Sequence, residues 1–412
     1  MSNHGFDLPD HWPIITSLHE HAGWGKWTLD PLKAAREEAA RINANREVAL
    51  GGGLDRVLRD APWVRRKDLL AGIAAYHRDA MSRIPSYAKH PESKPYVEHA
   101  LTVERELRHL ANLNDEEIAL VKSMGPYLKF RGFKEAGLAR SAPPRTERCR
   151  TVFLLNTDQG PFQIKNVDDP MPANYRPAPP LPARMPLKDF WWENVEWVAD
   201  GVGSGLHLDD EPDETFPLPV LFMAGQHAHD TPGVVEFLRR YSPFWGGCNL
   251  LIFDRKLRAM AVEKCSHNFF EAFPPTSDGW CHVSGMACRD PNSPQARYQR
   301  AKRQQYRKLY SLPEDGIDKT FWQFCDAGEQ MMVEGLSRLG EHPKVADVTR
   351  LFWTPYPGGL CKGGYRFHPD QPVTEYTMLT YATLFEKRRY WRWQRGQDPT
   401  VWPEQPEACQ FA

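Results

Sequence analysis

The sequence of 412 residues predicts an α+β fold, with a helical N-terminal region followed by strands that a block of helices interrupts. In the first third, apolar residues recur at the 3.6-residue spacing of a helix. From Cys149 onward the pattern changes to short β-like runs that do not alternate regularly with helices. Runs of strands favour an α+β layered fold over a regular βαβ fold. We therefore place a boundary between a helical segment, 1–148, and a β-rich domain, 149–412.

Four segments in the first third carry helix signals. The first begins with Asp30, a favourable N-cap residue, and Pro31 follows at the first helical position. A glycine at its end is typical of a helix C-terminus. The predicted helices cover 30–51, 67–84, 96–113 and 114–128. The proline-rich stretch 141–148 then breaks the helical pattern.

The remainder of the chain predicts two β-hairpins with further strands and helices around them. One hairpin runs from 149 to 169 with its turn at 158–160, and the other from 247 to 273 with a polar turn at 254–258. The many prolines between 170 and 189 favour an extended surface connection. Further strands are expected at 190–208, 217–227 and 373–396, and helices at 231–242, 293–311 and 317–340.

Composition and charge argue against several classes of function. The 52 Lys and Arg nearly balance the 53 Asp and Glu, so no excess of one sign points to nucleic acid or to an anionic membrane. No apolar run reaches the roughly 18 residues of a membrane helix. The start of the chain lacks the basic and apolar regions of a signal peptide. We expect a cytoplasmic protein that binds neither nucleic acid nor a membrane.

Eight cysteines are scattered singly, which indicates reduced thiols rather than a disulfide framework. The cysteines and histidines between 265 and 288 lack the paired spacing of a zinc site. A second group, His207, Asp209, His227 and His229, gives an alternative hypothesis of a metal-dependent hydrolase, although polar loop residues explain it more simply. The basic stretch 297–308 is interpreted as a solvated helix face. We expect no metal and no other cofactor.

Cys149 opens the first hairpin, where a nucleophilic cysteine would need a base, oxyanion donors and a group that orients the base. The return strand of an antiparallel hairpin brings Lys165, Asn166 and Asp168 back near Cys149. A cation near a thiol lowers the pKa of that thiol, and an aspartate can orient an ammonium group. A buried structural cysteine beside a charged hairpin end is the alternative interpretation.

The spacing in this hairpin resembles that of the N-terminal-nucleophile (Ntn) hydrolases. The closer likeness is to choloylglycine hydrolases, acid ceramidase-like amidases and acyl-CoA:isopenicillin N acyltransferases. A basic residue, Lys165, stands 16 positions after the cysteine, and Asp168 stands 19 positions after it. The stretch 246–264 looks like a family hairpin with Asn at its entry and Glu at its end. The stretch 293–306 looks like a Ser-led helix that carries a site-facing arginine, here Arg297.

The resemblance covers about 149–312 and implies an αββα four-layer sandwich behind a helical pro-segment. It implies that the chain cuts its own Arg148–Cys149 bond, so that the freed α-amino group becomes the general base. The thiol of Cys149 would then attack an amide or thioester carbonyl. Water or an amine would take the acyl group. The implied partner is a small-molecule amide or acyl donor, and the cut fragments would form a heterodimer, with a homo-oligomer as the other possibility.

The resemblance also assigns roles within the site. Asp168 would hold the amine, Lys165 would stand where the family has an arginine, and Arg297 would help to order the site. The sequence departs from the family at 284–285, where Ser-Gly replaces a Thr-Asn pair that donates to the oxyanion. Backbone N–H groups, Asn166 or Asn249 are the remaining candidates for that donor. The position of Asn249 is equally well explained if it is an ordinary strand residue.

A non-catalytic protein of the same fold is the main rival from another functional class. In it Cys149 would stay internal in the chain, and the molecule would act as a binding or scaffold subunit. The residue before the cysteine is Arg148, where the acyltransferase-like members often have glycine.

Overall fold

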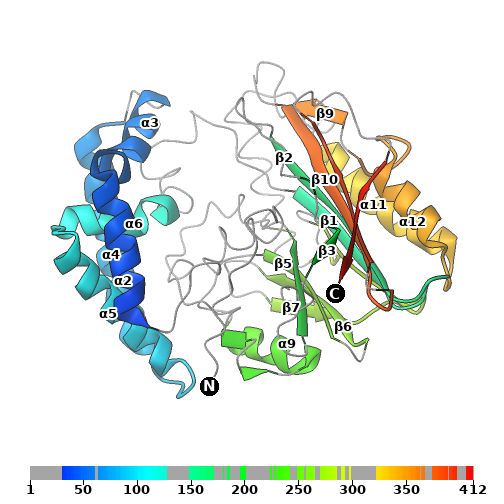
Figure 1. The fold of residues 1–412 in the computed structure, drawn as a ribbon, viewed down its shortest axis with the longest axis horizontal. Coiled ribbons are helices and arrows are strands. Elements are labelled where there is room, and N and C mark those ends of the chain that lie inside the picture. The colour runs from blue at the N-terminus through cyan, green and yellow to red at the C-terminus, as the bar shows by residue number, and fades with distance from the viewer. Residues whose placement is uncertain are drawn as a thin grey trace.

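The described residues form an α+β fold with two β-sheets whose strands are mainly antiparallel (Figure 1). In the computed structural model, the described residues are 30–60, 64–127, 148–170, 180, 183–185, 195–200, 223–224, 227–228, 230–241, 248–254, 257–264, 270–284, 289–292, 297, 322–361, 363–366, 374–387, 389–396 and 405–411.

The N-terminal segment is helical, as the apolar spacing predicts. Its elements are α2 (Pro31–Ala44), the π-helix η2 (Val48–Gly52), α3 (Gly53–Asp60), α4 (Arg66–Tyr87), α5 (Lys94–Leu110) and α6 (Asp115–Tyr127). The carboxylate of Asp30 accepts hydrogen bonds from the backbone N–H groups of Leu32 and Lys33, at 2.9 and 3.1 Å. This confirms Asp30 as an N-cap. Apolar side chains of α3, α4 and α6 form one core cluster of the segment.

The larger sheet has eight strands in the order β3-β12-β11-β10-β2-β1-β8, with β9 paired to β10. Its strands are β1 (Arg148–Leu154), β2 (Phe162–Pro170), β3 (Arg184–Met185), β8 (Trp280–Ser284), β9 (Gly363–Arg366), β10 (Thr374–Leu384), β11 (Arg389–Gln394) and β12 (Glu407–Phe411). The β12–β3 pair is parallel. Strands β1 and β2 lie in the interior of this sheet, with paired neighbours on both sides.

The smaller sheet has four strands in the order β4-β5-β6-β7, which are β4 (Val195–Asp200), β5 (Cys248–Asp254), β6 (Ala259–Lys264) and β7 (Phe270–Phe273). Each neighbouring pair is antiparallel. Strands β5 and β6 are the two arms of the second predicted hairpin.

Three clusters of buried side chains show how helices and sheets pack. Side chains of β1, β5, β6 and β8 meet between the two sheets, where Phe153 and Phe253 stack at 4.2 Å between ring centroids. Helices α11 (Trp322–Leu339) and α12 (Val345–Trp353) cover the other face of the larger sheet. Helix α9 (Thr231–Arg240) covers the outer face of the smaller sheet, and α4 and α5 of the N-terminal segment join the same cluster.

The structure bears out most of the expected elements. Both hairpins form, and the helices expected at 231–242 and 317–340 are α9 and α11. The expected strand 373–396 is a pair of strands, β10 and β11, joined by a turn. The stretch 217–227 was expected to be a strand, but its described residues Met223, Ala224 and His227 are helical, so this prediction is wrong there. The helix expected over 293–311 lies outside the described residues, apart from Arg297.

No helix among the described residues is long and apolar enough to cross a membrane.

Candidate active site

The hairpin of β1 and β2 brings the predicted site residues to one end of the larger sheet. The backbone register pairs Arg148 with Asp168 and Cys149 with Val167, and further along it pairs Thr151 with Lys165. The Arg148–Cys149 peptide bond therefore lies directly across from the Val167–Asp168 bond. The antiparallel return of Lys165 and Asp168 toward Cys149 is confirmed at the level of the backbone.

Lys165 and Asp168 nevertheless lie on opposite faces of the sheet. Side chains alternate between faces along a strand, and the β1–β2 register runs without a shift from Arg148 to Leu154. Lys165 shares its face with Phe153, which packs against the smaller sheet. Asp168 shares its face with Ile164, which packs under α11 and α12. The hairpin gathers the predicted residues at one end, but it divides them between two environments.

Asp168 is held on the helix-covered face by groups from two neighbouring strands. Its carboxylate accepts a 2.6 Å hydrogen bond from the hydroxyl of Thr377 on β10, and Nη1 of Arg150 lies 3.4 Å from its other oxygen. The side chains of Arg150 and Asp168 are 2% and 0% exposed. Carboxylates with several donors around them are fixed in orientation, so the side chain of Asp168 is held rigidly in the interior.

A second buried arginine, Arg395, lies at the same place. Its Nε donates to the backbone carbonyl of Thr377 at 2.7 Å, and its Nη2 lies 3.9 Å from the sulfur of Cys361. Burial lowers the pKa of Arg395, against the raising effects of Cys361, Tyr376 and Asp168. Burial likewise raises the pKa of the Cys361 thiol to about 11. A thiol with so high a pKa stays protonated at neutral pH, which argues against Cys361 as the nucleophile.

Helix α11 approaches Arg150 closely because residue 328 is a glycine. A Cβ atom at Gly328 would lie 2.7 Å from the guanidinium carbon of Arg150. The following residue, Glu329, is 2.7 Å from Nε2 of His282 on β8. Burial alone would raise the pKa of Glu329, but His282, Arg150 and Arg289 together hold it below its usual value. The charges of Asp168, Arg150 and Glu329 thus alternate in sign beneath the helix.

Asn166 was predicted to serve the substrate or the oxyanion, and the structure gives it a different role. Its Nδ2 donates to the carbonyls of Phe352 and Leu360, at 3.0 and 3.2 Å, while its Oδ1 accepts from the hydroxyl of Thr380 at 2.7 Å. An Asn side chain has two N–H donors, and both are used within the fold. This corrects the predicted role, because Asn166 has no donor left for an oxyanion.

Between the two sheets lie Lys165, from β2, and Glu263, from β6, a glutamate that was not among the predicted site residues. Lys165 is 3% exposed and Glu263, near the end of β6, is also 3% exposed. The backbone N–H of Arg289 lies 3.4 Å from both carboxylate oxygens of Glu263. Burial raises the pKa of Glu263 to about 8, although Arg289 opposes the rise. A carboxyl group of this kind can exchange a proton near neutral pH. The feature of the sequence that pointed to Glu263 was the glutamate at the end of the second predicted hairpin.

The remaining predicted residues are only partly described. Cys149 and Asn249 are described by backbone position alone: Cys149 pairs with Val167, and Asn249 pairs with Glu263. Arg297 is exposed, and its guanidinium donates to the backbone carbonyl of Asn292. This exposed position differs from the site-facing arginine that the resemblance implies. Arg150 and Arg395 are the arginines that the fold brings to Asp168.

Of the four residues in the alternative metal-site hypothesis, only His227 belongs to the described residues. His207, Asp209 and His229 lie outside the described residues. His227 is exposed, lies 3.5 Å from the hydroxyl of Tyr96, and stacks on Phe237 at 5.8 Å between ring centroids. Within the described ranges, no three His, Cys, Asp or Glu side chains are grouped so that they could hold a metal ion.

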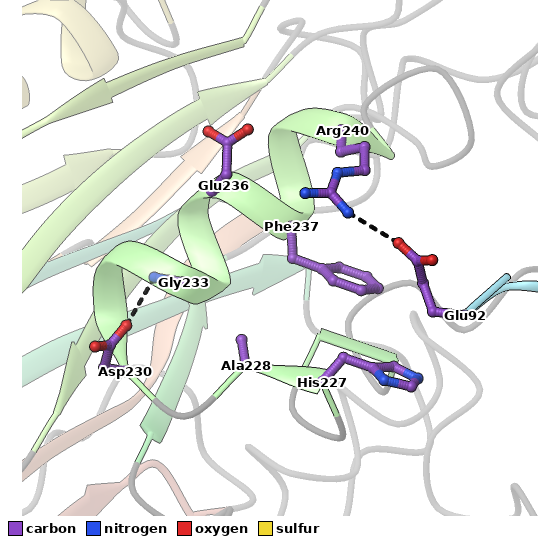
Figure 2. A pocket seen from close by; sticks show the side chains of 8 residues that line it. All are labelled: Glu92, His227, Ala228, Asp230, Gly233, Glu236, Phe237 and Arg240. Atoms are coloured by element: carbon purple, nitrogen blue, oxygen red, sulfur yellow. Dashed lines mark hydrogen bonds and ion pairs between the residues drawn. The ribbon is translucent and has the colours of Figure 1, made fainter. Parts of the chain in front are cut away.

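A surface pocket of about 530 Å³ lies beside His227 (Figure 2). Residues of α9 and of the segment before it line the pocket, together with Glu92 from the connection between α4 and α5. Arg240 of α9 pairs with Glu92 at 2.9 Å along its rim. None of the lining residues comes from β1 or β2, so this pocket is separate from the Cys149 end of the larger sheet.

Comparison with protein-family models gives no match for this chain, and comparison with curated proteins gives none either.

Proposed function

We propose that the chain is a cysteine-dependent amidohydrolase or acyltransferase of the Ntn type, in which cleavage of the Arg148–Cys149 bond frees the amino group of Cys149. The observation that carries the proposal is the register of β1 and β2. It sets the Arg148–Cys149 bond across from Asp168, a buried carboxylate fixed by Thr377 and Arg150. A fixed anion beside a newly formed amine would orient that amine as a general base.

The layer order of the β-rich part supports the same proposal. Helices α11 and α12, the larger sheet, the smaller sheet and helix α9 pack in succession through three core clusters. This succession is compatible with the αββα sandwich that the resemblance to Ntn hydrolases implies. Strand β1, which begins beside Cys149, lies inside the larger sheet and is paired on both sides. A nucleophile at the start of an interior strand would rest on a rigid framework.

The proposed reaction follows from the groups around Cys149. The freed α-amino group, with an ordinary pKa of about 8, takes the thiol proton. The thiolate then attacks the carbonyl carbon of the substrate, and the bond to the leaving amine or thiol breaks as the amino group returns the proton to it. The result is a thioester with Cys149. Water, or an acceptor amine, attacks this thioester and releases the acyl product.

Asp168 and Lys165 take separate parts in this scheme because they lie on opposite faces. Asp168 is opposite the backbone of Arg148 and would hold the new amino group. Lys165 lies on the face toward the smaller sheet, where a positive charge would favour the thiolate. Asn166 is occupied within the fold, so the oxyanion donors would be backbone N–H groups or Asn249.

One observation favours the rival reading as a non-catalytic binding protein. Asp168 already contacts Arg150 and Thr377, so its oxygens have partners in the uncut chain. A carboxylate can accept about four hydrogen bonds, and in the proposed site the new amine would join the donors already around Asp168. The two readings therefore differ in whether Cys149 becomes acylated.

The experiment is to incubate the purified chain with a panel of thioester and p-nitroanilide acyl donors, quench it in acid, and map adducts by peptide mass spectrometry. We expect an acyl group on Cys149, with a mass that depends on the donor. In the Cys149→Ser variant, mapping after incubation with the same thioester should find no adduct. The matched control is Cys361→Ser, which removes a buried thiol and should retain the adduct. If the wild-type chain is acylated only at other residues, or is not acylated by any donor, the result favours the hypothesis of a non-catalytic binding protein.

A further inference from the structure

The position of Arg150 suggests a function for it beyond holding the fold together. It follows Cys149 directly, it is 2% exposed, and it reaches Asp168 at 3.4 Å across the β1–β2 pair. Burying an arginine in the interior is costly unless charges and hydrogen bonds compensate it. Gly328 makes space for the buried side chain of Arg150, because the surface of α11 above the guanidinium has no Cβ atom at this position.

Asp168 by itself would make the freed amino group of Cys149 a poorer general base. An isolated carboxylate beside an amine stabilises the ammonium form, which cannot accept the proton of the thiol. A nearby guanidinium has the opposite effect, because it repels the ammonium charge while leaving the carboxylate able to accept a hydrogen bond. Arg150 is attached one residue after the amine and contacts the same carboxylate, so it can exert this effect.

We propose that Arg150 is a positioning residue that holds Asp168 in place and keeps the freed amino group of Cys149 uncharged at neutral pH. The inference rests on the proposed function, since the amino group exists only after the Arg148–Cys149 bond is cut. Arg150 itself transfers no proton and touches no substrate in this scheme.

Other charged and titratable groups surround the same place and must be considered with Arg150. Arg395, after β11, adds a second positive charge near Asp168, while Cys361 beside it is an uncharged thiol. Glu329 of α11 lies on the far side of Arg150, where it pairs with His282. Among the described residues, the titratable groups near Asp168 or Arg150 on this face include Arg395, Cys361, Glu329 and His282. Lys165 of β2 and Glu263 of β6 are buried on the other side of the larger sheet, between the two sheets.

The test measures the ionisation of the amino group directly. Full-length chain is labelled with [2-¹³C]cysteine, and the Cα resonance of Cys149, identified by its loss in Cys149→Ser, is followed by NMR from pH 5 to 10. Arg150→Met removes the positive charge at similar length. Arg150→Lys keeps the charge. We expect the titration midpoint to rise by about one pH unit in Arg150→Met, and to move by at most a few tenths in Arg150→Lys.

Two further variants separate this effect from general damage. Arg392→Met removes an arginine of β11 that is 1% exposed. Arg392 points to the opposite face of the larger sheet from Arg150. Strand β11 lies three strands from β1, which is about 14 Å at the usual strand spacing. Arg392→Met should leave the midpoint unchanged. Gly328→Ala keeps every charge but pushes the guanidinium of Arg150 from its site, so its midpoint should rise as well. It replaces Arg150→Met if that variant fails to fold or to cut itself.

The outcomes distinguish the two levels of the proposal. A cut wild-type chain whose midpoint is the same in Arg150→Met, or in Gly328→Ala, overturns the role of Arg150 and leaves the proposed function standing. An equal rise in Arg392→Met overturns it too, because the effect would not be local. A wild-type chain with no resonance that titrates as a free N-terminal cysteine overturns the proposed function, and the inference with it.

Discussion

The guanidinium of Arg150 lies 3.4 Å from the carboxylate of Asp168, and both side chains are at most 2% exposed. A buried ion pair of this kind contributes little by comparison with a well-packed apolar pair. Removing one partner is different, because the other is left as an uncompensated charge in the interior. The pair is therefore a sensitive place to test how the fold and the proposed site depend on one another.

Asp168→Asn should lower the free energy of unfolding by about 3–5 kcal/mol, because Arg150 keeps its buried charge and loses the carboxylate that it pairs with. Arg150→Met should have a cost of the same order. The double variant should cost clearly less than the sum of the two single variants. Urea unfolding of the four proteins checks this, and strict additivity of the two changes would contradict the ion pair.

Asn166→Ala should destabilise the chain by about 2–4 kcal/mol, since it leaves the carbonyls of Phe352 and Leu360 and the hydroxyl of Thr380 without their partner. The acylation of Cys149 per folded molecule should stay within a factor of about three of wild type. Urea unfolding measures the first quantity and adduct mapping measures the second. A loss of acylation of 10²-fold or more at full folding would restore Asn166 as an oxyanion donor.

Glu263 should make the stability of the chain depend on pH. Its pKa in the folded state is raised to about 8, so the folded chain binds a proton more tightly than the unfolded chain does. The contribution of this group to stability is complete below the unfolded pKa of about 4.3, and it is lost as the pH rises through about 8.

Thermal unfolding of Glu263→Gln between pH 4 and 9 checks this effect. The variant should lose part of the decline in stability that the wild type shows as the pH rises toward 9. Glu116→Gln, at an exposed position on α6, is the matched control and should keep the wild-type slope. Parallel pH profiles for wild type and Glu263→Gln would contradict the buried, protonatable state of Glu263.

The helical segment should stay bound after the proposed cut. Tyr96 and Ile84 of the segment share a core cluster with α9, β5 and β6. Fragments 1–148 and 149–412 should co-elute in native size-exclusion chromatography and separate only in denaturant. Tyr96→Ala should promote dissociation, because burial of a large aromatic side chain stabilises the contact by several kcal/mol.

Arg240→Ala serves as the control for that experiment. It removes only the ion pair with Glu92 at the surface, where such pairs contribute about 0–1 kcal/mol. Its fragments should co-elute as in the wild type. Separation of the wild-type fragments in native buffer would show that the cluster does not hold the cut segment.

Local signals in the sequence were sufficient for the hairpins. The turn residues at 158–160 and the β-like runs on either side predicted β1 and β2. Hairpin pairing then brought Lys165 and Asp168 back to Cys149. Their division between two faces was also accessible, because residues three apart on a regular strand point in opposite directions. Only a bulge between them could have brought both to one face.

The contacts of Asp168 depend on residues far apart in the chain, and no local pattern predicted them. Thr377 reaches Asp168 because β10 pairs with β2, and the space for Arg150 arises where α11 crosses at Gly328. The roles of Asn166 and Arg395 depend in the same way on the packing of the C-terminal third. Composition and spacing give the types of these residues but not their partners.

The measurement that tests the central claim most directly is the intact mass of the purified chain under denaturing conditions. The account predicts two fragments that meet at the Arg148–Cys149 bond, the second beginning with Cys149. It also predicts a single uncut chain for Cys149→Ala, and cleavage as in wild type for Cys281→Ala, which removes a buried thiol elsewhere in the fold. A wild-type chain that keeps its full mass, or a cut that persists in Cys149→Ala, would contradict the account.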